Sequence, residues 1–403
     1  MKILFYNHTG KASGAEGVLL MILAKIDRQR FQPIGLCPSD GSLAEMITRL
    51  GVKTFSIEPL VARFTWRPFC LLRYVASFFR LMRQARAVVT NEDPQIIHAN
   101  SIRAGLVMSV ATMGLAMPVV WHVHDILPHH PLSGVIRLIA RTSRRTHVVA
   151  VSVAVANRFR GLLFRRPIAV IHNAVDVELF HPNTRQRQET RQLLGFSEQD
   201  LILGAVGQLT PRKGQLELIK AFAEIAPDFP NTALTVVGEA IFNRDSEYAA
   251  SLHQTAAGLG IADRVYFLGR REDVTSLMRV FDLLVANSRV EPFGLTAIEA
   301  MASGTTVLAT AVDGFNEMIE HGRSGWLVEA GNHEELIAGI RALLSNTELR
   351  TQLSTTALSE ARLRFTVPRY LNDIQNFYSR TATPGGTPQS LGARGQAVKL
   401  SAE

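Results

Sequence analysis

The chain has 403 residues, 47% hydrophobic and 19% charged, which excludes a disordered protein and predicts two globular domains of average size. The formal net charge of +8 is unevenly placed: residues 1–180 hold 22 Lys and Arg against 10 Asp and Glu, whereas residues 181–403 hold 21 against 25. Two cysteines, Cys37 and Cys70, exclude a disulfide framework and a cysteine-based metal site, and they favour a cytoplasmic protein.

Membrane targeting is not expected from the apolar segments. The first predicted strand begins at Met1, so we expect no secretory signal before it. Residues 104–121 carry no charge and are barely long enough to span a bilayer. Their small residues, with Pro118, predict a helix followed by a strand over 119–123 instead.

The first half of the chain alternates between strands and helices. Strands are predicted over residues 2–6, 32–36, 52–57, 95–99, 119–123, 148–151 and 168–171, and a helix over 18–26 follows the first of them. This pattern predicts an α/β fold with a doubly wound parallel sheet over residues 1–175.

The loop after the first strand contains Ser13, Gly14 and Ala15. Its glycines, at 10, 14 and 17, match neither the dinucleotide fingerprint nor a P-loop. Two interpretations therefore stay open: an ordinary strand-to-helix turn, or a flexible loop in which the amides of Gly14 and Ala15 approach a ligand.

Residues 63–86 contain six arginines, no acid and interleaved aromatic residues. This composition favours a basic amphipathic helix lying on an anionic membrane surface. Single-stranded nucleic acid would also suit arginines and aromatics, and a helix with a solvated basic face is a third possibility. We expect the membrane surface, and no nucleic acid.

A polar stretch, 183–189, predicts the linker to a second domain. Beyond it, strands over 201–207, 232–238, 265–268, 283–286 and 306–309 alternate with helices over 215–225, 247–258, 274–281 and 295–302. We expect a second Rossmann-like domain over residues 176–365, facing the first across a cleft. A helix at about 366–380 is expected to pack back on the first domain, and 381–403 to be a disordered tail.

The most informative motif lies between residues 287 and 302. Two carboxylates, Glu291 and Glu299, flank a Pro-Phe-Gly turn that opens a helix. Pro292 disfavours helical geometry at Glu291, so Glu291 belongs to the loop and Glu299 to the helix. The free N–H groups at the helix start, those of Gly294, Leu295 and Thr296, predict a phosphate site between the two acids.

Two further sets of residues follow predicted strands, at the edge where parallel sheets bind ligands. Gly207 ends a strand, and Arg212 and Lys213 precede a helix start, where cations and the helix dipole favour a diphosphate. His122 and His124 end the strand over 119–123. We expect them to point to opposite faces, one buried and one toward the ligand as a hydrogen-bond donor or base, without a shared metal.

Together these motifs resemble the retaining glycosyltransferases of family four, the group-one type, which have the GT-B fold. The resemblance extends to about residue 380 and is most specific in the segment from Glu291 to Glu299. It implies that Glu291 contacts the donor sugar in a pocket lined by Phe293 and Gly294. It also implies that the diphosphate is held by Arg212, Lys213 and the amides of Leu295 and Thr296, that the ribose hydroxyls meet Glu299, and that the donor sugar meets His124. Ser13-Gly14 stands where the family more often has paired glycines.

The resemblance implies transfer of a hexose-type sugar from a UDP- or GDP-linked donor to a glycan or lipid-linked acceptor, with retained configuration. The nucleotide-sugar is a substrate, and neither a cofactor nor a metal is expected. A cytoplasmic enzyme at the inner face of the plasma membrane, in polysaccharide or glycolipid assembly, fits this interpretation. The alternatives are a sugar-nucleotide epimerase or phosphorylase, and a non-catalytic ligand-binding protein. A glycosidase would need both carboxyls beside one bond, which a phosphate site between them disfavours.

Overall fold

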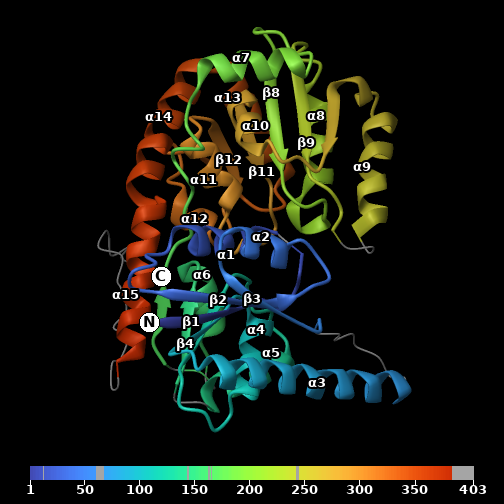
Figure 1. Ribbon diagram of the computed structural model, residues 1–403. Coiled ribbons are helices and arrows are strands. Elements are labelled where there is room, and N and C mark those ends of the chain that lie inside the picture. The colour runs from blue at the N-terminus through green and yellow to red at the C-terminus, as the bar shows by residue number, and fades with distance from the viewer. Residues whose placement is uncertain are drawn as a thin grey trace, which may run out of the picture. The chain divides into compact units, whose positions relative to one another are not determined.

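The computed structural model describes residues 1–11, 13–59, 68–142, 145–161, 164, 166–241 and 245–383 (Figure 1). Contacts divide the chain into an N-terminal unit, Met1–His172 with the chain from Leu371 onward, and a C-terminal unit, Asn173–Tyr370. The first part of the expected membrane-binding segment, 63–67, and most of the expected tail, 384–403, lie outside the described residues. So do the side chains of residues 68–75.

The described part of the N-terminal unit contains a seven-stranded sheet in which all pairings are parallel. Its order is β3 (Lys53–Ile57), β2 (Gln32–Pro38), β1 (Lys2–Tyr6), β4 (Ile96–Ala99), β5 (Val119–Val123), β6 (Thr146–Ala150) and β7 (Ile168–Val170). The helices are α1 (Gly14–Lys25), α2 (Leu43–Arg49), α3 (Pro68–Glu92), α4 (Ile102–Ala111), α5 (Pro131–Thr142), α6 (Val153–Phe159) and α15 (Val367–Ala382). Figure 1 shows α1 and α2 on one face of the sheet and α3, α4 and α5 on the other, which is the predicted doubly wound arrangement.

Helix α1 begins earlier than the sequence predicts, at Gly14 instead of residue 18. The reason is local: the carboxylate of Glu16 accepts hydrogen bonds from the backbone N–H of Ser13, at 3.1 Å, and from the Ser13 hydroxyl. This is half of a capping box, and it starts the helix at once. Gly14 and Ala15 are therefore the first turn of α1 and do not form a flexible loop.

Helix α15 packs on the sheet of the N-terminal unit although it follows the whole C-terminal unit in sequence. The Tyr378 hydroxyl lies 2.8 Å from Nδ1 of His98 on β4, and the Tyr378 ring packs edge-on against Phe5 and Phe31. Because Tyr378 is fully buried, these contacts fix the helix to the core of that unit.

The described part of the C-terminal unit contains a six-stranded parallel sheet. Its order is β10 (Val265–Gly269), β9 (Thr232–Val237), β8 (Leu201–Val206), β11 (Leu283–Ala286), β12 (Thr306–Thr310) and β13 (Trp326–Val328). The helices are α7 (Thr184–Leu193), α8 (Gln215–Ile225), α9 (Ser246–Gly258), α10 (Val274–Val280), α11 (Leu295–Ala302), α12 (Phe315–Met318), α13 (His333–Ser345) and α14 (Thr347–Arg364), with short 3₁₀ turns η1 (Pro211–Lys213) and η3 (Ala262–Arg264). Each sheet with its helices forms a Rossmann-like unit, and two such units in one chain are the pattern of the GT-B fold.

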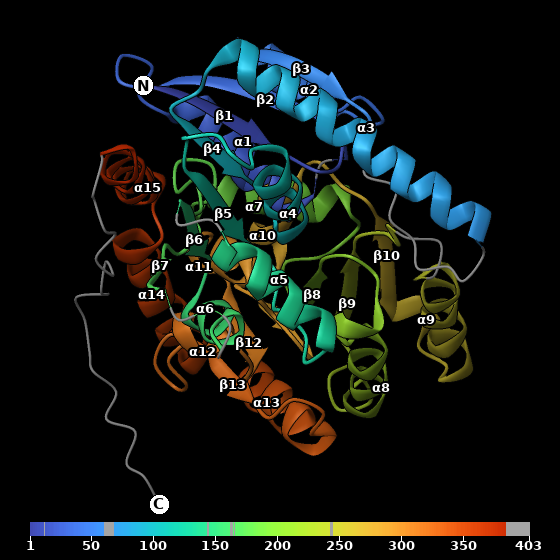
Figure 2. The ribbon, with the colours of Figure 1, turned by 90° about the horizontal axis from the view of Figure 1, so that it is seen from below.

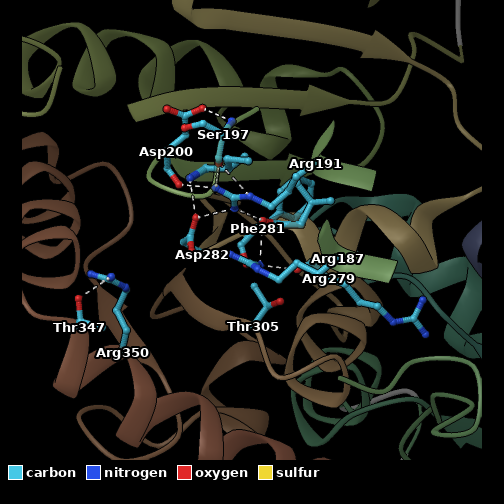
Figure 3. Close-up of polar contacts among 12 residues, drawn as sticks. Arg187, Arg191, Ser197, Asp200, Arg279, Phe281, Asp282, Thr305, Thr347 and Arg350 are labelled. Carbon is cyan, nitrogen blue, oxygen red and sulfur yellow. Dashed lines mark hydrogen bonds and ion pairs between the residues drawn. The ribbon is translucent and has the colours of Figure 1, made fainter. Parts of the chain in front are cut away.

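The expected linker at 183–189 is wrong, because residues from Thr184 onward form helix α7 inside the C-terminal unit. Asn183 caps the helix by accepting a hydrogen bond from the N–H of Gln186. Arg187 and Arg191 then reach across to the carboxylate of Asp282 at the start of β11, at 2.7 and 3.4 Å, and to the last carbonyls of α10 (Figure 3). This polar sequence thus forms a helix because its arginines donate hydrogen bonds to the unpaired carbonyls at the end of helix α10.

None of the described helices is long and apolar enough to cross a bilayer. The uncharged stretch 104–121 forms most of α4 and part of β5, as the sequence predicts.

Candidate functional site

The predicted residues of the C-terminal unit gather where the strand order changes direction, between β8 and β11. The loops after these neighbouring strands run to opposite sides at such a point and leave a crevice at the carboxyl end of the sheet. Gly207 follows β8 with a φ of 146°, and Gly238 follows β9 with a φ of 140°. A Cβ on Gly238 would lie 1.9 Å from the Gly207 carbonyl oxygen, so this approach requires glycine.

A buried ion pair stands at the centre of this crevice. Nζ of Lys213 lies 2.6 Å from Oε2 of Glu291, and the two side chains are 16% and 9% exposed. The Ser288 hydroxyl donates to the same carboxylate oxygen at 3.1 Å. Low exposure strengthens such contacts, so the pair holds the two loops in one arrangement.

The backbones of these loops are also joined. The N–H of Arg289 donates to the Arg212 carbonyl at 2.8 Å, and the Arg212 side chain donates to the Val290 carbonyl at 2.9 Å. Gly214, with a φ of 66°, ends η1, and a Cβ there would lie 2.1 Å from the Asn287 carbonyl oxygen. The Arg212 side chain remains exposed.

Helix α11 begins beside the ion pair. Gly294 precedes it with a φ of 108°, and a Cβ at this position would meet Phe315 at 2.6 Å. The N–H groups of Leu295 and Thr296, in the first turn, have no intrahelical acceptor and point out from the helix start. Lys213, Ser288 and Thr296 share the lining of a cavity of about 10 Å³, roughly the space for one water molecule. The cation and the helix start therefore lie together, as an anion site requires.

Phe293, for which a pocket-lining role is expected, lies in the core beside the turn. Its side chain is 3% exposed, and its ring packs edge-on against Phe365 with centroids 6.1 Å apart. It therefore supports the turn from within the core.

Two residues that the sequence reasoning missed hold Glu291 in place. The carboxylate of Asp313 accepts a hydrogen bond from the Glu291 N–H at 3.2 Å, and the N–H of Gly314 donates to the Glu291 carbonyl at 3.0 Å. Asp313 has a φ of 40°, a strained conformation for a residue with a side chain. Both residues follow β12 at the same sheet edge, so the rule used for the other strands would have indicated them.

Glu299 lies further along α11 and is partly enclosed. Burial raises the pKa of its carboxyl to about 7. The two acids thus differ in chemistry: Glu291 has an ion-pair partner, whereas Glu299 is a carboxyl that titrates near neutrality.

A larger hollow of the C-terminal unit, about 270 Å³, lies at the opposite, amino end of the strands (Figure 3). The arginines that line this hollow donate hydrogen bonds to carbonyls of the protein itself. Arg350 donates to the Leu343 and Leu344 carbonyls and to Thr347, and Arg279 donates to the carbonyls of Leu179 and His181. They close helix ends and chain turns, so this hollow is structural.

In the N-terminal unit, His124 ends a buried chain of polar side chains at the carboxyl ends of β1, β4 and β5. Its Nε2 lies 3.1 Å from Oδ1 of Asn100. Asn100 donates to Oδ1 of Asn7 at 3.1 Å, and Asn7 donates to Glu16 at 3.0 Å. Because Asn100 offers its oxygen to the ring, Nε2 carries the proton and Nδ1 keeps its lone pair. Burial lowers the pKa of His124 to about 3, so the ring is neutral.

The expectation that His122 and His124 point to opposite faces is wrong. Their ring centroids are 4.0 Å apart, because side chains two positions apart on a strand share a face. His122 is fully buried, and His98 lies next to it at 5.2 Å. Burial lowers the pKa of all three histidines. In the described residues, no group of three His, Cys, Asp or Glu is arranged to hold a metal ion.

Comparison with known proteins matches the two units separately. Residues 12–179 match the family "Glycosyltransferase Family 4", and residues 186–359 match "Glycosyl transferases group 1". A D-inositol 3-phosphate glycosyltransferase of Stackebrandtia nassauensis is 32% identical over 234 residues, 55% of this chain and 52% of the relative. A lipopolysaccharide core biosynthesis mannosyltransferase, LpcC, of Rhizobium leguminosarum bv. viciae is 30% identical over 54% of this chain and 61% of the relative. The chain thus spans just over half the length of these curated relatives.

Among solved structures, Anabaena HepE in complex with UDP and glucose superposes with a TM-score of 0.80 and 29% identity, over 94% of this chain and 99% of HepE. HepE has also been solved with UDP-glucose. This similarity covers both units.

Proposed function

Because the chain belongs to the glycosyltransferases of family four, the group-one type, we propose that it transfers a hexose-type sugar from a nucleotide-sugar to a glycan or lipid-linked acceptor, with retained configuration. The observation that carries the proposal is the Lys213–Glu291 pair beside the start of α11. The cation and the free helix amides suit a diphosphate, and the carboxylate suits a sugar hydroxyl. A ligand that contains both a sugar and a diphosphate therefore fits this crevice better than a sugar or a diphosphate alone.

The reaction breaks the bond between the anomeric carbon and the donor phosphate oxygen, and the electron pair stays on the diphosphate. The acceptor hydroxyl oxygen bonds to the anomeric carbon, and its proton passes to the departing diphosphate. Negative charge grows on the phosphate, so Lys213, Arg212 and the amides of Leu295 and Thr296 stabilise the transition state there. With these groups present the proposal requires no metal.

Each remaining residue has a proposed role. Glu291 receives hydroxyls of the donor sugar, and its present partner Lys213 turns to the diphosphate when the donor binds. Glu299 accepts the ribose hydroxyls. His124, neutral and with Nδ1 free of a proton, accepts a hydrogen bond from a sugar hydroxyl, which favours the base or acceptor role over the donor role considered from the sequence. Gly207, Gly14 and Ala15 allow backbone approach to the ligand.

A UDP-sugar is the first donor to test, because HepE, at 29% identity, has been solved with UDP-glucose. The protein is incubated with UDP- and GDP-sugars, with and without a lipid-linked glycan acceptor, and release of nucleoside diphosphate is followed. Release that depends on the acceptor is expected. Interconversion of donor sugars indicates an epimerase, dependence on inorganic phosphate indicates a phosphorylase, and binding without turnover indicates a ligand-binding protein.

The cation has a direct test. Lys213→Ala should lower turnover at least about a hundredfold, the scale of losing one stabilising group at a developing anion. Lys220→Ala, on exposed surface of the adjoining helix α8, is the matched control and should keep full activity. Full activity of Lys213→Ala would remove Lys213 from the diphosphate site.

A cytoplasmic enzyme held peripherally at the inner face of the plasma membrane completes the proposal, since a lipid-linked acceptor is presented there. The support is the arginine-rich composition of the N-terminal unit.

A further inference from the structure

Helix α5 carries a row of exposed aliphatic side chains. Leu132, Val135 and Leu138, three positions apart, are 61%, 51% and 48% exposed. The opposite side of the helix is buried, with Ser133 at 2% and Ala140 at 0%. Single exposed apolar residues are common on protein surfaces, but a row at helical spacing marks a face that contacts something else.

The neighbouring helices extend this apolar surface. Helix α4 contacts both α3 and α5, and Figure 2 shows the three helices in succession. Phe79 on α3 is 59% exposed, and Met113, just after α4, is 67% exposed. Arg86 on α3 donates to the Ala111 and Met113 carbonyls, both at 3.0 Å, and so joins α3 to the end of α4. We call the exposed apolar residues of this helix layer the α3–α5 face: Phe79, Met113, Leu132, Val135 and Leu138.

The surrounding charge is mostly positive. Residues 59–172 contain 15 arginines, no lysine and three acids, Glu92, Asp93 and Asp125, and Glu58 just before them pairs with Arg80 of α3 at 3.2 Å. Each of the three helices contributes exposed guanidinium groups, among them Arg83, Arg103 and Arg141. Neither α4 nor α5 contains an acidic residue. The apolar row therefore lies in a region that attracts anions.

We propose that the α3–α5 face docks on an anionic bilayer, and that α5 is the element that inserts, placing Leu132, Val135 and Leu138 at the acyl boundary while the arginines contact lipid phosphates. Exposed apolar side chains flanked by basic residues bind anionic membranes in this way. The inference deepens the proposed function, because it places the enzyme at the surface that holds a lipid-linked acceptor. It adds α5 to the sequence-predicted segment 63–86, whose Phe79 belongs to the same face.

Two other occupants fit less well. A second copy of the chain docked through the same face would bring two arginine-rich surfaces together, and like charges oppose such a dimer. Single-stranded nucleic acid binds through exposed aromatic side chains on which bases stack, and the α5 row is aliphatic.

The test is flotation of the full chain with vesicles of phosphatidylglycerol and phosphatidylethanolamine, and with neutral phosphatidylcholine vesicles. The wild type should float with the anionic vesicles only. The triple variant Leu132→Ser, Val135→Ser, Leu138→Ser should lose at least about tenfold in partitioning, because three partly inserted aliphatic side chains are removed. Binding of the triple variant at the wild-type level would overturn the assignment to α5.

Matched controls come from the C-terminal unit. Leu193 on α7 and Leu363 on α14 are 86% and 69% exposed, so Leu193→Ser and Leu363→Ser remove comparable apolar surface elsewhere and should float like the wild type. Circular dichroism of each variant checks that it is folded. Equal loss of binding in the controls would also overturn the proposal.

A fluorescent label on α5 distinguishes insertion into a bilayer from binding of a second copy of the chain or of nucleic acid. An environment-sensitive dye on Val135→Cys, in a Cys70→Ser background, should shift to shorter wavelength on anionic vesicles, whereas the dye on Leu193→Cys should not. A shift that requires protein concentration instead of lipid, with dimers in sedimentation, would replace the bilayer by a second copy. A shift with oligonucleotides alone would replace it by nucleic acid.

Failure of this inference is distinguishable from failure of the proposed function. With a water-soluble acceptor glycan, the triple variant should release nucleoside diphosphate at the wild-type rate, since Leu132, Val135 and Leu138 are not among the residues proposed to hold the donor. Flotation without any transfer activity in the wild type would reject the function and retain the docking surface.

Discussion

The carboxyl of Glu299 predicts a pH dependence of donor binding. Burial raises its pKa to about 7, so the ionised fraction rises from about 9% at pH 6 to about 91% at pH 8. If the ribose hydroxyls donate to the ionised carboxylate, the Kd of the donor should fall about tenfold over this interval. Raising the pH thus strengthens binding, because the acceptor form is the deprotonated one.

Calorimetric titration with an intact nucleotide-sugar measures this effect cleanly, because a diphosphate esterified at both ends has no proton to lose between pH 6 and 8. Glu299→Gln keeps the shape and removes the titration, so its Kd should be weaker than that of the wild type at pH 8 and nearly independent of pH. A wild-type Kd that stays constant, or a Glu299→Gln variant with the same slope as the wild type, would refute the assignment.

Three other predictions concern Glu291 and the stability of the fold. Glu291→Ala should lower turnover by orders of magnitude in steady-state assays with a smaller change in donor Kd, the reverse of Glu299→Gln. Arg191→Met should destabilise the C-terminal unit by roughly 3 kcal/mol in denaturant titrations, because it breaks a buried network around Asp282. Arg185→Met, on the exposed side of α7, is the control and should leave the denaturation midpoint unchanged. His98 has its pKa lowered to about 3 by burial, so the unfolded chain binds more protons below pH 6.5; stability should fall as the pH drops, by roughly 2 kcal/mol at pH 5 from this residue, and His98→Gln should weaken that dependence.

Much of the fold is predictable because strands of a parallel sheet are buried on both faces and are read as apolar runs. The predicted strands over 119–123 and 283–286 coincide with β5 and β11, and the helix over 295–302 coincides with α11. Helix α7 was missed for the opposite reason. Its sequence is polar, and its stability comes from Arg187 and Arg191 bonding to α10 and Asp282, which are about 90 residues distant in the chain.

In the candidate site, too, some features follow from the local sequence and others depend on residues that are distant in the chain. Gly294 and the helix start at Leu295 follow from local chemistry, since proline, glycine and helix formers occur in order. The strand-end rule could also have indicated Asp313, but its hydrogen bond to Glu291 and the Lys213–Glu291 distance depend on which strands are neighbours, and no local pattern encodes that. The wrong prediction for His122 and His124 did not come from missing information. Side chains two positions apart on a strand lie on the same face, so the sequence alone already implied that the two rings are neighbours.

The neutral state of His124 fits the proposed chemistry in a way that its position alone does not. In the proposed reaction positive charge develops at the anomeric carbon while negative charge develops on the diphosphate. A protonated imidazole at the sugar would oppose the first of these charges. Burial lowers the pKa of His124 to about 3, and Asn100 holds the proton on Nε2, so the ring offers a lone pair without a charge. The fixed cations, Lys213 and Arg212, belong instead to the loop after β8, where the proposed diphosphate binds. The buried polar chain behind His124 consists of Asn100, Asn7 and Glu16, so none of its members brings a positive charge to the ring, in keeping with the proposed role.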